Sequence, residues 1–186
     1  MSAKVEPLLT ISDLDALPND GNRYELFDGE IIVSCAPGLP HQRILTNIIF
    51  LFSTHLARHN IGEVIATPGV IFDDFNGVIP DVIYISHERA REVATGDRLT
   101  GAPELMIEIV SPGKENSRRD RLLKRRSYGR HGVEEYWIID PEKRTVEIYR
   151  RDGRTLRLVA TLADDEEVTP PLLPGFRCRA RQVFGA

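Results

Sequence analysis

The sequence predicts an α/β (α+β) protein in which helices flank one mixed β-sheet, within a single domain covering residues 1–186. One long helical pattern occurs, at residues 41–59, among many short β-forming runs separated by turn residues. The composition is ordinary for a globular protein, at 41% hydrophobic and 28% charged residues. A chain of this length can bury a substantial core.

The first elements follow from caps, turns and periodicity. Residues 10–17 predict a short capped helix. Residues 23–34 predict an N-terminal β-hairpin, because the pair Asp28-Gly29 is flanked by β-forming residues on both sides. Residues 41–59 place apolar side chains at helical spacing along one face, and Gly62 is a suitable stop signal.

Short strands dominate the rest of the chain. They are predicted at residues 63–67, 69–72, 78–86, 105–110, 134–140, 145–149 and 156–162. A polar, partly helical connection separates the strands 78–86 and 105–110, and a basic helix is predicted at 118–131. Residues 170–175 are rich in proline and predict irregular structure, followed by a last helical turn at 180–184.

The charge is distributed unevenly. The chain carries a net charge of −4, which argues against a generally basic nucleic-acid-binding protein. Residues 118–131 contain seven Lys or Arg and one acid, so this segment is +6 and the remainder −10. A concentrated basic element on an acidic body is compatible with a localised surface that binds phosphate.

No segment predicts a membrane protein or a secreted one. The longest apolar run, residues 48–52, is far too short to span a bilayer, and residues 1–6 lack an apolar signal core. We therefore expect a cytoplasmic protein. Cys35 and Cys178 have no metal-ligand spacing and are interpreted as thiols in a reducing compartment.

Two acids interrupt the apolar pattern of neighbouring predicted strands. Asp81 begins the run Val82 to Ile85, and Glu108 has apolar neighbours on both sides. A buried carboxylate needs a partner, because an unpaired one is costly. Arginine is one possible partner, and Asp81 taken alone is compatible with a turn-capping acid. Mg²⁺ or Mn²⁺ is the partner that the two acids together favour, since these cations prefer carboxylate oxygens.

A lysine usually completes such a site two residues after the second acid, where this chain has Val110. Asp120, Lys124 and Tyr128 recur at i, i+4 and i+8 on one face of the predicted basic helix. Lys124 is therefore a candidate for the missing ammonium. The alternative is a surface lysine paired with Asp120, a contact that contributes only ~0.3–0.5 kcal/mol.

These motifs occur in a series that resembles one bacterial family. The series is Arg23-Tyr24-Glu25-Leu26-x-Asp28-Gly29-Glu30, His41-Gln42-x-Ile44, Pro80-Asp81, Glu108-x-Val110-Ser111-Pro112, Asp120-x3-Lys124-x3-Tyr128, residues 132–141 and residues 171–175. It is similar to the Uma-type putative restriction endonucleases of the PD-(D/E)XK nuclease superfamily. The resemblance covers roughly residues 10–184, and the ordered series is more specific than any single motif.

The resemblance implies a restriction-endonuclease-like core, a mixed β-sheet flanked by helices with acids on adjacent strands. It also implies that the catalytic lysine has migrated to the helix after the second acidic strand, which selects Lys124. By the same resemblance, Asp81 and Glu108 become metal ligands for Mg²⁺ or Mn²⁺, and the backbone carbonyl of Ile109 a third. Glu25 becomes an additional catalytic acid, unless it pairs with Arg23 or a helix end.

Other residues are expected at the periphery of the site. His41 opens the long helix and is expected to reach a phosphate or a water, unless it is only a polar residue of the first turn. Tyr128 either hydrogen-bonds near the site or packs the helix onto the sheet. Lys114 lies near Glu108 in sequence and competes with Lys124. Phosphate contact is expected from a set of four arginines, namely Arg118, Arg119, Arg121 and Arg125.

The leading functional hypothesis is a Mg²⁺- or Mn²⁺-dependent endonuclease that hydrolyses phosphodiester bonds of DNA, as a homodimer. The metal would activate a water and polarise the phosphoryl oxygen, and a nearby ammonium would balance the charge of the transition state. Two alternatives remain: a non-catalytic nucleic-acid-binding or interaction module on the same fold, and a structural protein whose buried acids pair with arginines.

Overall fold

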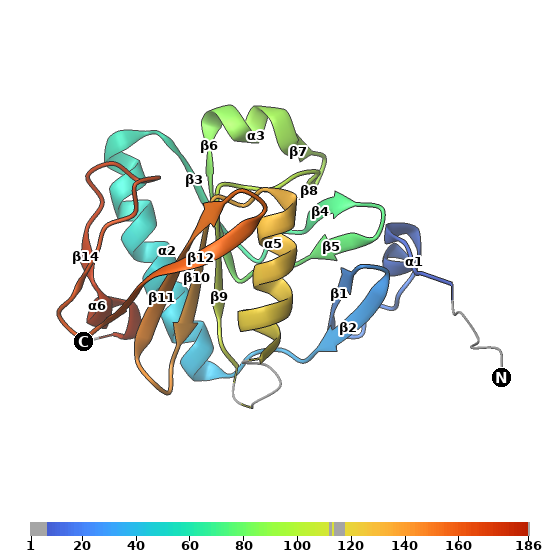
Figure 1. Cartoon of the computed structure of the whole chain (residues 1–186), viewed down its shortest axis with the longest axis horizontal. Coiled ribbons are helices and arrows are strands. Elements are labelled where there is room, and N and C mark those ends of the chain that lie inside the picture. The colour runs from blue at the N-terminus through green and yellow to red at the C-terminus, as the bar shows by residue number, and fades with distance from the viewer. Residues whose placement is uncertain (1–6, 112, 114–117, 186) are drawn as a thin grey trace.

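The computed structural model describes residues 7–111, 113 and 118–185 (Figure 1). Within these ranges a central sheet and a second sheet, each six-stranded, form the body. The central sheet has the order β12 (Thr155–Ala163), β11 (Thr145–Asp152), β10 (Glu135–Asp140), β9 (Leu105–Ile109), β6 (Val82–Ser86) and β3 (Gly62–Ala66). The second sheet has the order β2 (Glu30–Ser34), β1 (Arg23–Phe27), β5 (Asn76–Val78), β4 (Val70–Asp73), β8 (Arg98–Leu99) and β7 (Ala94–Thr95).

Both sheets are mixed. In the central sheet β9 and β10 are parallel and the other neighbours antiparallel, whereas in the second sheet only β4 and β8 run parallel among the described pairings. The sequence predicted one mixed sheet, and this prediction was wrong, because the strands form two large sheets. The predicted strand 78–86 divides into β5 in the second sheet and β6 in the central sheet. Pro80 lacks the N–H that a continuous ladder needs, so the chain crosses between sheets there.

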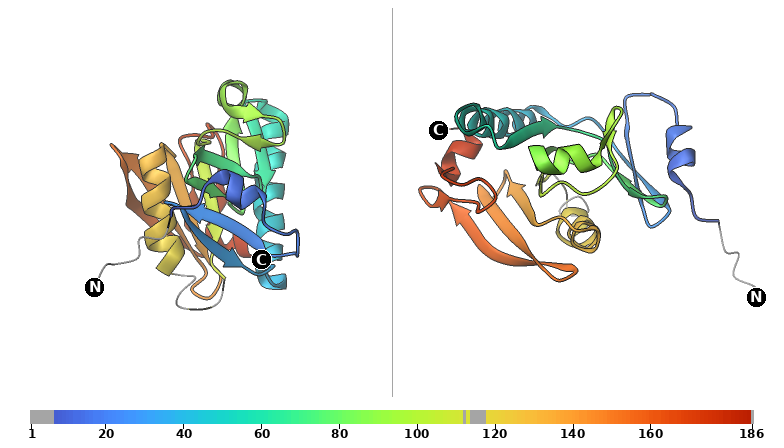
Figure 2. Two further views of the ribbon diagram at one scale, coloured as in Figure 1. Left: turned by 90° about the vertical axis from the view of Figure 1, so that its right-hand side faces the viewer. Right: turned by 90° about the horizontal axis from the view of Figure 1, so that it is seen from above.

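Two helices cover opposite faces of the central sheet (Figure 2). Helix α2 (Leu39–His59) packs Ile44, Ile48 and Phe52 against one face. Helix α5 (Arg125–His131) packs Tyr128 against the other face, on the side to which the second sheet also contributes. Since β9 lies between these layers, all five of its residues are buried, as its sequence predicts for an internal strand.

The N-terminal hairpin is confirmed. Strands β1 and β2 pair antiparallel from Arg23 opposite Ser34 to Phe27 opposite Glu30. The connecting Asp28 and Gly29 both have positive φ angles, 49° and 81°, as the two-residue turn favoured by hairpins requires.

The long helix ends at His59, as predicted, but its capping residue is not the predicted Gly62. Asn60, not Gly62, adopts the left-handed conformation, with φ of 48°, and its N–H caps the carbonyl of Leu56. Gly62 instead begins β3, where its backbone lies against that of Ile85 in β6. Glycine is required there because of close packing between strands.

The predicted basic helix consists of two parts. Residues Arg119–Lys124 form a π-helical turn, η1, and α5 continues it to His131. The remaining elements are α1 (Ile11–Asp15), which has Thr10 at its N-cap, α3 (His87–Val93), α6 (Ala180–Phe184) and the small pair β13 (Glu167–Val168) and β14 (Cys178–Arg179). Among the described residues, none of the helices has the length and apolar character needed to cross a membrane.

Gly62→Ala is expected to destabilise the fold by about 1–3 kcal/mol, the usual range for overpacking. A Cβ at Gly62 would collide with the carbonyl oxygen of Ile85 and lie 2.9 Å from the Cα of Ser86, and a backbone cannot easily retreat. Gly69→Ala is the matched control, because its Cβ would meet only the Cβ of Arg98 at 3.5 Å. Urea denaturation measures both variants, and equal stabilities would contradict the packing argument.

Candidate active site

The alternation of side chains along β9 decides which residues can meet. Leu105, Ile107 and Ile109 pack on the α2 side of the central sheet, and Met106 and Val110 on the α5 side. Glu108 has the parity of Met106 and Val110, so it faces α5. A lysine in place of Val110 would share that face, and a lysine carried by the η1–α5 helix reaches it from outside the strand.

Asp81 reaches the same point from the neighbouring strand. The antiparallel register of β6 and β9 pairs Val82 with Ile107, so its continuation by one residue sets Asp81 opposite Glu108. Both side chains are buried, with 2% and 3% exposure. The sequence-based expectation of two acids on adjacent strands is therefore confirmed in its geometry.

Asp81 is held by three donors. Its Oδ1 accepts a hydrogen bond from Arg23 Nη1 at 3.0 Å. Its Oδ2 accepts the N–H of Ile109 at 2.9 Å and lies 3.0 Å from His41 Nε2. Burial alone raises the pKa of Asp81, but the contact with His41 and the positive charge of Lys124 lower it below the usual value. Asp81 is therefore an anion at neutral pH.

Lys124 bridges the other two acids. Its Nζ lies 2.9 Å from Glu108 Oε1 and 3.2 Å from Glu25 Oε2, and its side chain is only 4% exposed. Glu25 also accepts the backbone N–H of Ile79 at 3.0 Å, between β5 and β6. The alternative of a surface lysine was therefore wrong, and so was the pairing of Glu25 with Arg23 or a helix end; the expected partner of that surface lysine, Asp120, has its side chain outside the described residues.

Tyr128 lies one turn beyond Lys124, on the same helix face, and reaches the same acid. Its hydroxyl donates to Glu108 Oε1 at 2.6 Å, and its ring packs in the core beside Tyr136. Tyr128 therefore has both of the roles expected for it: it hydrogen-bonds at the site and packs the helix onto the sheet. Burial, and then the charges of Glu108 and Glu25, raise its pKa well above the usual value, so the phenol stays protonated and donates.

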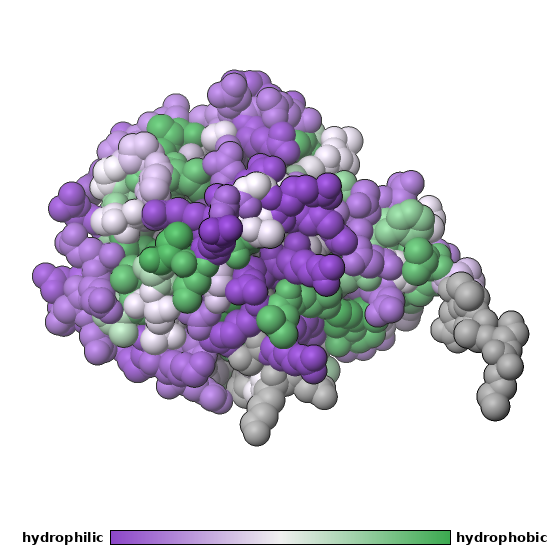
Figure 3. All heavy atoms as spheres, in the orientation of Figure 1, coloured by the Kyte–Doolittle hydropathy of each residue, from purple (hydrophilic) through white to green (hydrophobic). Residues whose placement is uncertain are grey.

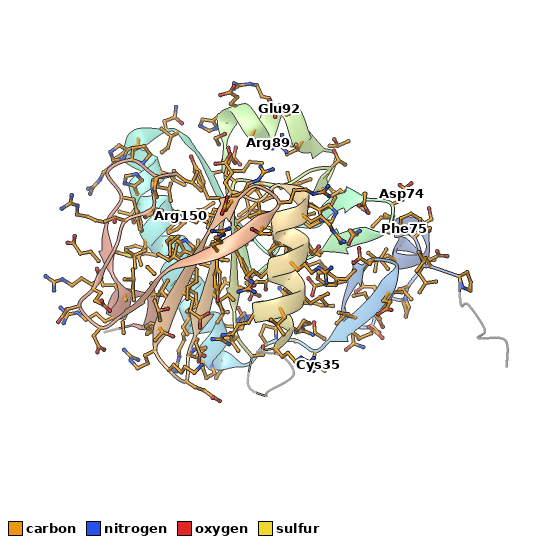
Figure 4. All side chains as sticks on the ribbon, in the orientation of Figure 1. Cys35, Asp74, Phe75, Arg89, Glu92 and Arg150 are labelled. Atoms are coloured by element: carbon orange, nitrogen blue, oxygen red, sulfur yellow. The ribbon has the colours of Figure 1, made fainter. Side chains whose placement is uncertain are left out.

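A small cavity of about 40 Å³ lies among these groups, with room for an ion or a water. Its wall includes the three acids, Lys124, His41 and the side chain of Cys35, whose position is labelled in Figure 4. The carboxylate of Asp81 can only accept a hydrogen bond, so His41 donates to it through Nε2–H. In a neutral imidazole the other ring nitrogen, Nδ1, is then an acceptor. That Nδ1 is buried and has no hydrogen-bond partner in the described part of the chain.

A larger cleft of about 680 Å³ adjoins the small cavity and shares His41 and Ser111 with it. Its other lining residues combine apolar surface with charged rims, among them Pro40, Val110, Leu122, Pro141, Arg118 and Lys143. The buried acids are therefore connected to a groove at the surface rather than enclosed in the core.

The four arginines expected to contact phosphate separate into two pairs. Arg118 is exposed, and Arg119 lines the small cavity. Arg121 instead pairs with Asp140 at 2.9 Å and Glu147 at 2.7 Å.

The guanidinium of Arg125 lies over the ring of Tyr149 at 5.3 Å. Arg121 and Arg125 therefore anchor the helix to β10 and β11, and Arg121 also lines the larger cleft. Lys114 lies outside the described residues, as does the side chain of Asp120.

The donor set suits a hard dication in its chemistry. Asp81 and Glu108 supply carboxylate oxygens on one cavity wall. Among the described residues, no three His, Cys, Asp or Glu side chains are arranged as a metal site, so a main-chain oxygen would have to join them. Ile109 fits this role, because its N–H already points at Asp81, and the N–H and C=O of one strand residue face the same side.

Arg23 is the site residue that sequence reasoning missed. It was noted only as a possible partner of Glu25, yet it pairs with Asp81 and lines the cavity. A signal for it exists in the sequence, because Arg23 and Glu25 are two residues apart in a strand and must face the same side.

A mixed central sheet flanked by helices, with Asp81 just before β6 and opposite Glu108 of β9, is the arrangement expected of a restriction-endonuclease-like core. The chain belongs to the Uma2 family, whose sequence model, described as "Putative restriction endonuclease", matches residues 11–181. The resemblance seen in the motifs is thereby confirmed.

A solved structure shares the fold. It is described as a putative nuclease belonging to DUF820 from Anabaena variabilis, and it superposes with a TM-score of 0.77 at 21% sequence identity. The match covers 95% of this chain and 97% of that one. No protein of curated function matches the chain.

Lys124→Met is expected to destabilise the fold by about 3–5 kcal/mol at neutral pH, because it leaves Glu25 and Glu108 buried without their cation. Chemical denaturation at neutral pH measures this loss. The control Lys143→Met removes a 65% exposed lysine and should cost less than ~1 kcal/mol; similar losses in both variants would refute the bridging role.

Proposed function

We propose that this protein is a Mg²⁺- or Mn²⁺-dependent endonuclease that hydrolyses phosphodiester bonds in DNA. The observation that carries the proposal is the convergence of Asp81, Glu108 and Lys124 on one cavity, although they come from two strands and a helix far apart in sequence. Membership of a family described as putative restriction endonucleases supports the same reaction class.

Each residue of the site would have its own role in the hydrolysis. Asp81, Glu108 and the carbonyl of Ile109 would hold the dication, which would supply an activated water and polarise the phosphoryl oxygen. Lys124 would orient the attacking water and balance negative charge that develops on the phosphate. Because Lys124 needs no rearrangement to reach the acids, it is preorganised for this role.

The remaining groups would position these. Tyr128 fixes the carboxylate of Glu108 through Oε1, and Glu25 fixes the ammonium of Lys124. His41 would accept a proton through Nδ1, the buried nitrogen without a described partner. Arg118 and Arg119 would contact the DNA backbone where the larger cleft meets the small cavity.

We also propose that the protein works in the cytoplasm as a homodimer. Figure 3 shows a largely hydrophilic face on which apolar side chains gather over β12. Leu158 and Val159 of that edge strand are 52% and 50% exposed, which is surface that a second copy would cover.

The nuclease test compares the intact chain with Asp81→Asn, Glu108→Gln and Lys124→Met on supercoiled plasmid in Mg²⁺ or Mn²⁺. Each variant should lose at least about 10²-fold in cleavage rate, because each removes a group that acts on the transition state. EDTA should abolish cleavage, and Arg154→Gln, in the exposed turn between β11 and β12, should cut at the normal rate. Equal cleavage by all four proteins would reject the site. DNA binding without cleavage would favour the alternative, a non-catalytic nucleic-acid-binding module.

Arg118→Gln should weaken DNA binding and reduce the slope of log affinity against log salt by about 0.9, the effect of one lost phosphate contact. Fluorescence anisotropy with a short duplex in EDTA measures binding without cleavage. Arg154→Gln makes the same charge change in the exposed turn between β11 and β12 and should leave the slope unaltered. A slope that changes equally in both variants would mean only a general effect of net charge.

A further inference from the structure

Arg23 is the donor that holds Oδ1 of Asp81. Its Nη1 lies 3.0 Å from Oδ1, and Oδ2 is already engaged by His41 and the N–H of Ile109. The described donors therefore occupy three of the roughly four acceptor positions of the carboxylate. A dication can take Oδ1 fully only if Arg23 leaves.

The charges of the cavity lining lead to the same requirement. Three acids, Glu25, Asp81 and Glu108, face three cations, Arg23, Arg119 and Lys124. With the His41 imidazole counted as neutral, these formal charges cancel. A dication would add two positive charges to a balanced and largely buried group, which is unfavourable unless a cation withdraws.

Arg23 is better placed to withdraw than Lys124. The Lys124 side chain is 4% exposed and pairs with two acids, whereas the Arg23 side chain is 24% exposed and, among the described residues, pairs with Asp81 alone. Arg23 is also the first residue of β1, and withdrawal of its side chain leaves the backbone pairing of the hairpin unchanged.

We propose that Arg23 is a latch on the metal site: it neutralises Asp81 until a dication displaces it, and the released guanidinium then binds a phosphodiester oxygen of the substrate. This inference rests on the proposed metal-dependent function and adds an order of events to it. A guanidinium suits both partners, because its planar donors match carboxylate and phosphate oxygens alike.

The decisive experiment titrates Mn²⁺ into the full chain without DNA and follows the free ion by electron paramagnetic resonance. Arg23→Gln should bind Mn²⁺ about tenfold more tightly than the intact protein, since a repelling charge is gone. Arg23→Lys keeps the charge and should stay close to the intact protein, and Arg154→Gln should match it. A purely structural role for Arg23 predicts weaker or unchanged binding in Arg23→Gln.

A second measurement uses the unmodified protein and does not depend on the folding of Arg23→Gln. The Nε–H signal of Arg23, assigned by its loss in Arg23→Lys, should shift in ¹H–¹⁵N spectra when Mg²⁺ is added. A signal that stays unchanged at saturating Mg²⁺ overturns the latch.

The Mn²⁺ affinities and cleavage rates together distinguish failure of the Arg23 latch from failure of the proposed nuclease function. Equal Mn²⁺ affinity in the intact protein and Arg23→Gln, with plasmid cleavage that still needs Asp81, overturns the latch alone. Failure of every protein to bind Mn²⁺ overturns the latch together with the metal-dependent function. Tighter Mn²⁺ binding combined with at least tenfold slower cleavage in Arg23→Gln supports both halves of the proposal, whereas unchanged or faster cleavage overturns the contact with phosphate.

Discussion

The ammonium of Lys124, held between Glu25 and Glu108, is the interaction on which the rest of the structure depends. The three residues come from the η1–α5 helix, from β1 in the second sheet and from β9 in the central sheet. Buried charges are tolerated only when they are paired. The two sheets and the helix must therefore pack in one relative arrangement. The candidate active site is thus also the contact that fixes this arrangement.

The division of the predicted strand 78–86 between two sheets helps to bring these acids together. Residues 79–81 leave the second sheet with the N–H of Ile79 donated to Glu25, and they enter the central sheet at Asp81. One short crossing thus positions two of the three acids. These two acids stay anchored by backbone donors even though the cavity opens towards a surface cleft, which keeps them ordered beside that cleft.

Local patterns predicted the hairpin, the long helix and the acid pair, because turn residues and periodicity determine them over a few residues. The spacing of Lys124 and Tyr128 likewise predicted a shared helix face, and both do reach Glu108. The second sheet, the cap at Asn60 and the pairing of Arg23 with Asp81 were not predicted. Each depends on contacts between segments distant in sequence, and an arginine in a strand has no local signal that names its partner.

The π-helical turn η1 separates two functions along one helix. Such a turn spends about one residue more than an α-helical turn on the same rotation, so a one-residue deletion there is absorbed by a return to α-helix. Arg118 and Arg119 precede or open the turn, while Lys124 and Tyr128 close or follow it. A one-residue change in the length of this turn therefore leaves the arginines on one side, and the lysine and tyrosine at Glu108 on the other, in nearly the same relative orientation.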